Sequence, residues 1–292
     1  MSKQKILFII NPNSGGKSKN KNIEEKIKKI IPENASELIF EYTARAGHAA
    51  EIVSEYLQKG LDHFVAVGGD GTVNEIAARL RNTGALLSII PLGSGNGLAR
   101  HLNISFKLEK AVKIILDKNI KTIDSGEING IPFFCTAGIG FDAYCADIFN
   151  NGHHGRGLSN YVRIILTNFF TYKAKTCSFE GNPVEYFSMS FGNADQFGNN
   201  AYITPKAIID DDFLDCTLIK KHPKFHGLEL MYRLMNKTID QSRYTEYYRA
   251  KTFKVEADEN LLIHFDGESK QLDTHQLEVK IIEKALRITS GI

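Results

Sequence analysis

The segment HFVAVGGDGTVNEIAARL, residues 63–80, decides the fold of the first part of the chain. Residues 63–67 form a mostly apolar run of strand length, and three glycines follow within the next four positions. Apolar residues then recur at helical spacing over residues 72–80. A buried strand, a glycine-rich turn and an amphipathic helix form the repeating unit of a parallel α/β sheet. The segment therefore predicts a crossover connection to a further parallel strand.

The same alternation extends to both sides of this segment. Strand patterns are predicted at residues 5–10, 37–42 and 86–90, and helical patterns at residues 23–31, 49–57, 97–101 and 108–116. From about Ile120 to Ile282 most segments read as strands, and only residues 160–172 and 227–237 look helical. We therefore expect an α/β N-terminal domain with a mostly parallel sheet. An antiparallel β domain with one or two helices on it should follow.

The composition is that of an ordinary globular protein. The 292 residues are 42% hydrophobic and 24% charged, which excludes collagen-like, disordered and coiled-coil classes. Lys and Arg number 36 against 34 Asp and Glu, so bulk charge predicts no nucleic-acid partner. The four cysteines lie far apart and form no CxxC pair. We expect reduced core thiols in a cytoplasmic protein, without a zinc site or disulfides.

Neither a signal peptide nor a membrane-spanning helix is predicted. The apolar run at residues 6–10 is too short for a signal peptide. Residues 131–149 are interrupted by Pro132, Asp142 and Asp147, so they do not read as a spanning helix. Any contact with a membrane should therefore be made from the surface.

Three glycine-rich turns follow three of the predicted strands, at residues 11–17, 68–75 and 91–97. In a parallel sheet such turns lie at the carboxyl ends of the strands, where ligands bind. Glycine lets the backbone approach a ligand, and the helix N-termini that follow favour anions. Three such turns predict a polyphosphate site. The alternatives are that the glycines only form tight turns and that Thr72 and Glu75 form a capping box.

Two other nucleotide-binding fingerprints match incompletely. A P-loop needs a glycine five residues before Gly16, where the chain has Asn11, so the P-loop interpretation fails. Residues 138–143 match G-x-G-x-x-A after a strand, yet they lie in the β-rich part with no clear βαβ unit around them. A dinucleotide-binding turn at this place is therefore only an alternative.

Taken together, the three turns resemble the diacylglycerol kinase catalytic domain, which soluble bacterial lipid kinases, sphingosine kinases and ceramide kinases share. The matching residues are Asn11-Pro12-x-Ser14-Gly15, Gly68-Gly69-Asp70-Gly71-Thr72-x-Asn74-Glu75 and Pro91-Leu92-Gly93-Ser94-Gly95-Asn96-x-Leu98-Ala99-Arg100. Later matches, in the family's order, are Asp124, residues 138–143, Pro205-x-Ala207 and Phe265-Asp266-Gly267-Glu268. The resemblance covers nearly the whole chain.

The resemblance implies an ATP-dependent lipid kinase with a nucleotide-binding domain at residues 1–125. A β-sandwich with an apolar lipid pocket would follow at residues 126–283, and residues 284–292 would return to the first domain. The active cleft would lie between the two domains. The acceptor would be the hydroxyl of a lipid such as diacylglycerol or a sphingoid base. The enzyme would be cytoplasmic, would use Mg²⁺ and would touch a membrane surface transiently. The resemblance leaves undecided whether it forms a homodimer.

The family's functional positions carry over residue by residue. The implied ATP-binding residues are Asn11, Pro12, Asn13, Ser14, Gly15, Thr43, Gly69, Asp70, Gly71, Thr72, Val73, Asn74, Glu75 and Ser94. Asp266 would be the base that takes the proton of the lipid hydroxyl, and Glu268 would support it. Asp70 is the rival for the base, although we expect it to be a partner of Mg²⁺ or of the nucleotide. The alternative for Asp266 and Gly267 is a plain hairpin turn.

The acids after Pro205 match the place of a structural Mg²⁺ in bacterial relatives. The implied ligands are the Asp211 carboxylate and the carbonyl oxygens of Ile208 and Phe213. The alternative is a solvated acidic turn. The family usually has glycine where Asp212 stands, and Asp tolerates a positive φ better than most residues.

A second departure is Gly97, where bacterial members usually carry an aspartate in a network with the residue that matches Asp124. This departure supports the alternative of a catalytically silent relative that binds nucleotide or lipid. The glycine-rich turn at residues 68–75 is also shared with NAD kinases, which are the other alternative. Four aromatic residues could meet a lipid chain or pack in the core; they are Tyr161, Phe169, Phe170 and Tyr172.

Overall fold

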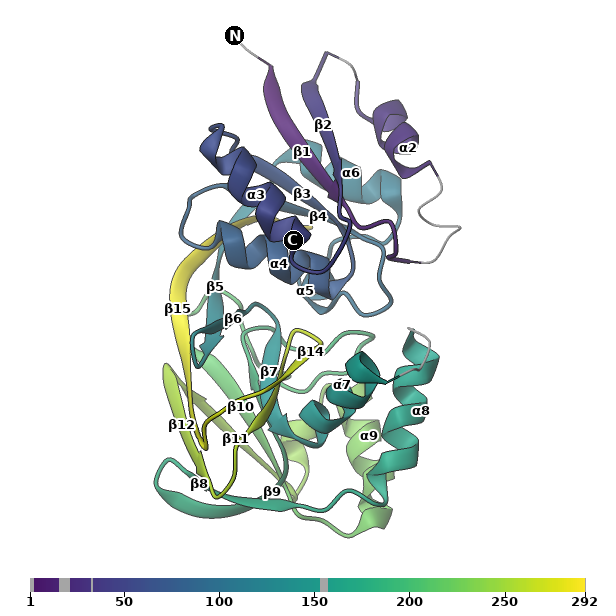
Figure 1. Ribbon diagram of the computed structural model, residues 1–292. Coiled ribbons are helices and arrows are strands. Elements are labelled where there is room, and N and C mark those ends of the chain that lie inside the picture. Colours follow the sequence, from purple (N-terminus) through teal and green to yellow (C-terminus); the bar gives the residue numbers. More distant parts are fainter. Residues whose placement is uncertain (1–2, 16–21, 33, 153–156, 292) are drawn as a thin grey trace. The chain divides into compact units, whose positions relative to one another are not determined.

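The computed structural model describes residues 3–15, 22–32, 34–152 and 157–291 (Figure 1). The chain divides into two compact units. Unit 1 comprises Met1–Ile123 and Lys284–Ile292, and unit 2 comprises Asp124–Glu283. Gly16, Lys17 and the residues up to 21, which complete the first glycine-rich turn, lie outside the described residues.

Unit 1 is built on a parallel sheet, as the sequence predicts. Its strands are β1 (Gln4–Ile10), β2 (Ser36–Tyr42), β3 (His63–Gly68), β4 (Leu86–Pro91) and the last residues of β15 (Gln276–Thr289). Their order is β15-β4-β3-β1-β2, and every neighbouring pair is parallel. All residues of β3 and β4 are buried. Central parallel strands are apolar at consecutive positions because helices cover both faces of the sheet.

Among the residues that the structure describes, unit 1 has five helices. They are α2 (Ile23–Ile30), α3 (His48–Gln58), α4 (Asp70–Leu80), α5 (Gly97–His101) and α6 (Leu108–Asp117). Helix α3 contacts α4 and helix α2 contacts α6. In Figure 1 the α3 and α4 pair lies in front of the sheet and α6 lies behind it. The predicted helices are confirmed, with ends that differ by one or two residues.

A line of buried polar side chains crosses the sheet of unit 1. His63 on β3 is fully buried, and its Nε2 lies 2.9 Å from Oγ of Ser88 on β4. The hydroxyl of Thr289 on β15 donates to the same Ser88 oxygen over 3.0 Å. Burial lowers the pKa of His63 to about 4, because the imidazolium form would lose its hydration.

Unit 2 is an antiparallel β structure. Its strands, besides most of β15, are β5 (Ile120–Ile128), β6 (Ile131–Phe133), β7 (Thr136–Gly140), β8 (Lys175–Phe179), β9 (Asn182–Gly192), β10 (Leu214–Lys220), β11 (Thr245–Ala250), β12 (Thr252–Ala257), β13 (Leu262–Phe265) and β14 (Glu268–Gln271). Strand β9 pairs with β7, β8 and β10, which branches the sheet. Phe133, Phe191 and Phe253 lie in the core between the strands. The predicted antiparallel domain is confirmed. Aromatic and aliphatic side chains of its strands share one buried core, as in a β-sandwich.

Within the described part of unit 2, three α-helices lie on the strands, where the sequence predicts one or two. They are α7 (Phe141–Asn151), α8 (Leu158–Phe169) and α9 (Gly227–Met235). The expectation of one or two helices was wrong because α7 has apolar residues at four consecutive positions, 143–146, and so lacks a clear one-sided helical period. The helices enclose a second apolar cluster, in which Tyr161, Phe169 and Tyr172 pack. Within the described residues, no helix is long and apolar enough to cross a membrane.

All four cysteines are free and buried, as predicted. Burial raises the pKa of the Cys145, Cys177 and Cys216 thiols above the usual range. These thiols therefore stay protonated and pack as small apolar groups.

Acid should destabilise the protein partly through His63. In the unfolded chain an imidazole binds its proton near pH 6.5, whereas His63 in the folded chain does so only near pH 4. Between these values the unfolded state binds more protons, so folding stability falls as the pH is lowered from about 6.5 to about 4. We expect urea unfolding of His63→Asn to depend less on pH over this range than that of the wild type. His275→Asn, which changes an exposed histidine, is the control, and equal pH dependence in all three proteins would contradict the prediction.

Candidate functional site

The three predicted turns come together at one edge of the sheet of unit 1. Strands β1, β3 and β4 are parallel neighbours, so the turns that follow them begin side by side. The N–H of Asn11 donates to the carbonyl oxygen of Val67 over 3.0 Å, and the N–H of Leu92 donates to that of Gly68 over 2.9 Å. Thus the first and third turns are both tied to the end of β3, where the second turn begins.

The carboxylate of Asp70 joins the second turn to the third. Its Oδ2 accepts the N–H of Asn96 over 2.8 Å, and its Oδ1 accepts the N–H of Gly97 over 2.9 Å. Gly95 is required for this contact, because a Cβ there would lie 2.7 Å from Oδ2 of Asp70. The two turns are therefore held by charge-assisted hydrogen bonds, which are shorter and stronger than neutral ones.

The backbones of the second and third turns also touch directly. A Cβ on Gly93 would lie 2.8 Å from Cα of Gly69, which is closer than side-chain carbons approach. The side-chain amide of Asn96 donates to the carbonyl oxygen of Gly68 over 3.3 Å. Glycine at position 93 is therefore a packing requirement as well as a feature of the family pattern.

Asn11 joins the first turn to the second. Its Nδ2 donates to Oγ1 of Thr72 over 3.1 Å, and its Oδ1 accepts the N–H of Asn13 over 2.9 Å. Thr72 lies inside helix α4 and does not cap it, and the Glu75 carboxylate accepts the N–H of Gly47 over 2.9 Å. The capping-box alternative is therefore wrong, and both side chains link the helix to other turns.

The remaining predicted ATP-binding residues occupy the same edge of the sheet. They are Pro12, Ser14 and Gly15 on the first turn, Gly71, Val73 and Asn74 on α4, and Ser94 on the third turn. Thr43 follows β2, and its N–H donates to the carbonyl oxygen of Ile10 over 2.9 Å. At the start of α4, the N–H groups of Gly71 and Thr72 have no acceptor within the helix, which makes this edge favourable for an anion.

In unit 2, Asp266 and Gly267 form the turn of the β13–β14 hairpin. Their φ angles are 45° and 89°, the two positive values that a type I′ turn requires. Phe265 pairs with Glu268 across the turn, and Glu268 is exposed. The hairpin interpretation is confirmed, and it does not exclude a chemical role.

The Asp266 carboxylate is held by three backbone donors. Its Oδ2 accepts the N–H of Phe134 over 2.7 Å. Its Oδ1 accepts the N–H of Cys135 over 2.8 Å and that of Thr136 over 3.1 Å. Asp266 therefore fixes the chain between β6 and β7, and its orientation in turn is fixed by that chain.

Asp124 is buried and organises the acidic loop. Its Oδ2 accepts the N–H of Asp212 over 2.9 Å, and its own N–H donates to the carbonyl oxygen of Ile209 over 2.9 Å. Asp212 has a φ of 64°, so this position does adopt the left-handed conformation for which the family uses glycine. Asp215, the second residue of β10, is also buried, and burial raises its pKa to about 6.

The predicted metal ligands Ile208, Asp211 and Phe213 belong to this loop. The Asp211 carboxylate pairs with the Arg249 guanidinium and accepts the N–H of Phe213 over 3.2 Å. Within the described residues, no group of three or more His, Cys, Asp or Glu side chains is placed to hold a metal. A site of one carboxylate and two carbonyl oxygens differs from such a group, so it stays a prediction.

Residues 138–143 do not form a dinucleotide-binding turn. They lead from β7 into α7, but both neighbours of β7, which are β9 and β13, are antiparallel to it. A Cβ on Gly138 would lie 2.3 Å from the carbonyl oxygen of Met189, and one on Gly140 would lie 2.7 Å from that of Phe187. Close packing of β7 on β9 explains these glycines.

A polar cluster under the start of α7 was missed by the sequence analysis. The Asp142 carboxylate accepts the hydroxyls of Ser188 and Ser190, the latter over 2.8 Å. His264 is buried beside β7, and burial lowers its pKa. The alternation of Ser188 and Ser190 on one face of β9 was a usable signal, but only the pairing of β9 with β7 shows what it faces.

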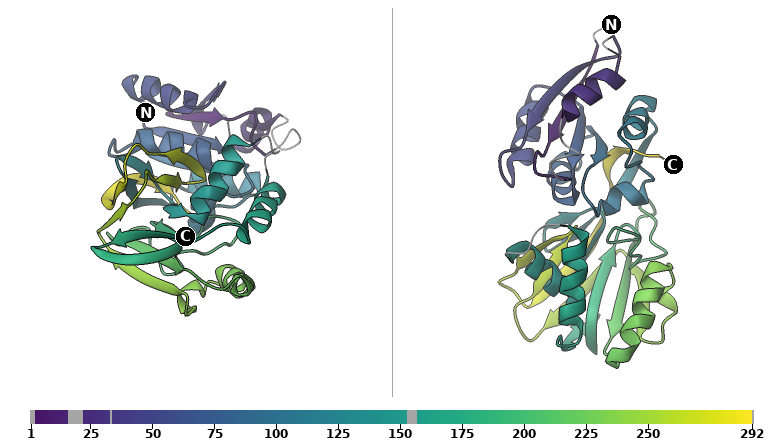
Figure 2. Two further views of the ribbon diagram at one scale, coloured as in Figure 1. Left: turned by 60° about the horizontal axis from the view of Figure 1, so that its bottom comes forward. Right: turned by 90° about the vertical axis from the view of Figure 1, so that its right-hand side faces the viewer.

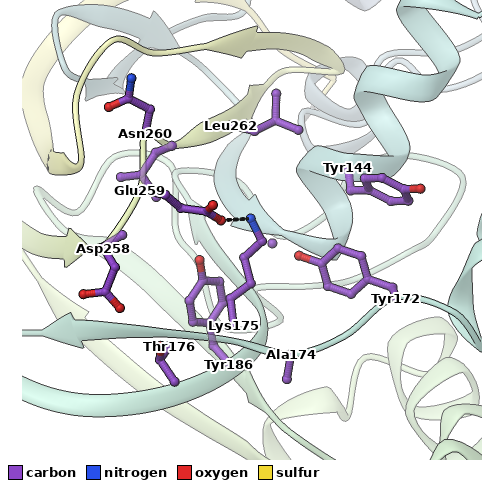
Figure 3. A pocket seen from close by; sticks show the side chains of 13 residues that line it. Tyr144, Tyr172, Ala174, Lys175, Thr176, Tyr186, Asp258, Glu259, Asn260 and Leu262 are labelled. Atoms are coloured by element: carbon purple, nitrogen blue, oxygen red, sulfur yellow. Dashed lines mark hydrogen bonds and ion pairs between the residues drawn. The ribbon is translucent and has the colours of Figure 1, made fainter.

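A cavity of about 330 Å³ opens within unit 2 (Figure 3). The hydroxyls of Tyr172 and Tyr186 point into it, and the Lys175 ammonium group donates to the Glu259 carboxylate over 2.6 Å at its side. The lining mixes phenolic and charged side chains with apolar ones, among them Leu261 and Leu262, so it neither matches nor excludes the apolar lipid pocket that the family resemblance implies. Other apolar side chains of the helices, among them Phe141, Ile164 and Leu230, pack on one another in the second cluster.

Comparison with known proteins identifies the family. Residues 5–128 match the diacylglycerol kinase catalytic domain, and residues 135–290 match the YegS C-terminal NAD kinase beta sandwich-like domain. The chain therefore belongs to the diacylglycerol kinase family, and within it to the YegS type of lipid kinase.

Its relatives agree with this assignment. The chain is 29% identical to a protein named probable lipid kinase YegS-like from Pseudomonas aeruginosa, over 99% of this chain and 95% of that one. It is 30% identical to a protein of the same name from Serratia proteamaculans, over 73% of this chain and 72% of that one. The crystal structure of a diacylglycerol kinase from Bacillus anthracis superimposes with a TM-score of 0.74 at 20% identity, covering 100% of this chain and 98% of that one. This last likeness shows the fold alone.

The link between the second and third turns should fail when Gly95 gains a side chain. In Gly95→Ala the methyl group would push the Asp70 carboxylate away from the N–H groups of Asn96 and Gly97. We expect faster amide hydrogen exchange at residues 96 and 97 and a loss of about 1–3 kcal/mol in the free energy of unfolding. Ser94→Ala, an exposed position in the same turn, is the control. Unchanged exchange at residues 96 and 97 in Gly95→Ala would show that Asp70 does not hold the third turn.

Proposed function

We propose that this protein is an ATP-dependent lipid kinase that transfers the γ-phosphate of ATP to a lipid hydroxyl. The observation that carries the proposal is the joining of three glycine-rich turns by Asn11 and Asp70 at one edge of a parallel sheet. This arrangement presents backbone N–H groups and a helix N-terminus to a single polyphosphate. The acceptor class, a lipid such as diacylglycerol or a sphingoid base, follows from the family.

On the nucleotide side, residues 11–15 and 69–75, with Thr43 and Ser94, bind ATP in this proposal. The N-terminus of α4 faces the negative charge of the phosphates, and the glycines allow close approach of the backbone. Asp70 holds the third turn in register with the second, and this contact also places a carboxylate next to the phosphate edge. We keep Asp70 as the candidate partner of the nucleotide or of its Mg²⁺.

On the acceptor side, Asp266 is the proposed base, supported by Glu268. A hydroxyl must lose its proton as it attacks the γ-phosphate, and a carboxylate in hydrogen-bonding reach accepts it. Three N–H donors keep the Asp266 carboxylate in one orientation. Such fixed orientation is what a proton acceptor needs in order to contribute to the rate.

A structural Mg²⁺ is proposed at Asp211, with the carbonyl oxygens of Ile208 and Phe213. These are oxygen ligands, which suit Mg²⁺, and Asp124 already shapes the loop through Asp212. The Arg249 guanidinium, which pairs with Asp211, would have to share or yield the carboxylate. When bound, the ion would supply rigidity to this loop.

Two other functions are weighed against lipid phosphorylation. An NAD kinase would share the turn at residues 68–75, and the matched C-terminal domain is named after the NAD kinase sandwich. A silent relative would bind nucleotide or lipid without turnover, for which the absence of an acid at Gly97 is the support. Phosphate incorporation into NAD, or ATP binding without transfer to any lipid class, would identify these cases.

The proposed roles of Asp266 and Asp70 can be separated by isosteric amides. Asp266→Asn should lower turnover with ATP and extracted lipid by about 10²- to 10⁴-fold, because the proton acceptor is lost, while ATP still raises the melting temperature. Asp70→Asn should weaken that ATP-dependent stabilisation, since its carboxylate holds the third turn. Because both carboxylates also accept backbone N–H groups, the melting temperature without ATP is recorded for each variant.

Asp62→Asn, an exposed position in unit 1, is the matched control and should behave as wild type. Near-normal turnover in Asp266→Asn, with an inactive Asp70→Asn that still binds ATP, would reverse the two roles. No phosphate transfer to any lipid class by the wild type would reject the proposed function.

The proposed Mg²⁺ site predicts a thermal shift that needs no ATP. Mg²⁺ should raise the melting temperature of the wild type, because a ligand that binds only the folded state stabilises it. Asp211→Asn should lose most of this rise, whereas the neighbouring Asp210→Asn should keep it. Equal rises in the wild type and in Asp211→Asn would exclude Asp211 as a ligand.

A further inference from the structure

Helix α9 turns a complete apolar stripe to solvent. Leu228, Met231, Tyr232 and Met235 recur at steps of three and four residues, and their exposed fractions are 73%, 48%, 67% and 48%. In a globular protein such a stripe normally faces the core. In α9 the core contact is made by Leu230 on another side of the helix. The exposed stripe is therefore left over after the helix has packed on unit 2.

Helix α8 and the residue that follows it show a second stripe. Leu158, Val162, Leu166 and Phe170 recur at steps of four residues, with exposed fractions of 43%, 41%, 54% and 68%. Ile164 is the buried residue of this helix. Large exposed apolar patches mark places where a protein binds another surface.

The two helices meet where α8 ends and α9 begins. The Lys224 ammonium group donates to the carbonyl oxygens of Phe169 and Tyr172 over 2.7 Å and 2.6 Å. A Cβ on Gly227 would lie 2.3 Å from the Phe169 ring, so the two helices are in contact there. Both lie on one side of unit 2, which faces the viewer in the right-hand view of Figure 2.

We name this region the α8–α9 surface. It consists of Leu158, Val162, Leu166, Phe170, Phe225, Leu228, Met231, Tyr232 and Met235. Phe225, next to Lys224, is 74% exposed. Among the described residues, the α8–α9 surface holds nine of the fifteen large apolar side chains that are exposed. The exposed apolar area is thus concentrated on two helices and is not scattered over the molecule.

The charges around this surface are positive. Residues 158–173 and 220–243, which carry the two helices, contain eight Lys and Arg but only two Asp and Glu. The whole chain is nearly balanced, with 36 against 34. Lys220, Lys221 and Lys237 pair with acids outside these segments, which are Glu246, Glu185 and Asp195, so the local excess is three positive charges, eight against five. Arg163, Lys173 and Arg243 are exposed among the cations. Apolar side chains bordered by cations complement an anionic bilayer, where the chains enter the interface and the cations lie at the headgroups.

We infer that the α8–α9 surface docks this protein on an anionic lipid bilayer. Contact with water is unfavourable in free energy for the nine apolar side chains, and their transfer into the interfacial layer of a bilayer removes them from water. The inference rests on the proposed lipid kinase function for its purpose, which is to bring unit 2 to the layer that holds the acceptor. The docking itself requires neither ATP nor turnover, so it can be tested without either.

The test is cosedimentation of the full chain with vesicles. The wild type should bind vesicles of equal parts phosphatidylglycerol and phosphatidylcholine, and should bind pure phosphatidylcholine at least about tenfold more weakly. The variant Phe225→Ser, Leu228→Ser, Tyr232→Ser should bind the mixed vesicles at least about tenfold more weakly than the wild type. Arg163→Glu with Lys173→Glu should reduce binding to the mixed vesicles and leave binding to pure phosphatidylcholine unchanged.

The matched control replaces two exposed apolar residues outside the surface, as Ile120→Ser with Tyr248→Ser, and should bind as the wild type does. Circular dichroism melting confirms that each variant is folded. No binding of the wild type, or equal binding by the wild type and the triple serine variant, would overturn the inference. A wild-type dimer in sedimentation that the triple variant abolishes, with vesicle binding unchanged, would assign the surface to a second copy of the chain instead. Vesicle binding without phosphate transfer to any lipid would reject the proposed function and leave the docking intact.

Discussion

The arrangement of unit 1 depends on one carboxylate that accepts two backbone N–H groups. Asp70 stands at the start of α4, and Asn96 and Gly97 open the third turn. Parallel strands bring these turns to the same edge, but strand pairing alone does not fix their distance. The charge-assisted bonds fix it together with the bonds of Leu92 and Asn96 to Gly68, and a side chain at position 95 would displace the carboxylate that makes them. Some of the glycines are therefore explained by the close approach of the turns to one another.

In unit 2 the Asp266 carboxylate likewise accepts hydrogen bonds from backbone N–H groups. A type I′ turn places this aspartate at a positive φ, and its carboxylate then gathers the N–H groups of Phe134, Cys135 and Thr136. Asp124 does likewise for Asp212 in the acidic loop. The aspartates for which the family pattern implies a functional role therefore also accept hydrogen bonds that hold irregular backbone in place. An amide at such a position changes both roles at once, which is why stability and turnover must be measured together.

Much of the fold could be predicted from the sequence, because buried parallel strands and amphipathic helices leave strong periodic signals. Helix α7 could not be predicted, since residues 143–146 are all apolar and leave no clear one-sided period. The pairing of Thr72 with Glu75 as a capping box was wrong for another reason. Their partners, Asn11 and Gly47, are distant in the sequence. Short patterns predict local hydrogen bonds, but they contain no information about competing partners from other elements.

The side of a helix that faces solvent is the other feature that periodicity leaves undetermined. In α9 both Leu230 and the stripe of Leu228 and Tyr232 are apolar, so the sequence alone gives two candidate core faces. Packing on the second apolar cluster selects the side of Leu230, and the remaining side chains stay in water at a cost in free energy. Glu229 and Arg233 form an ion pair on α9, so the helix keeps a polar side and its exposed stripe is a second apolar face that favours a cover. The bilayer docking inferred above supplies such a cover, because the exposed cations Arg163 and Lys173 lie on the segment that carries α8.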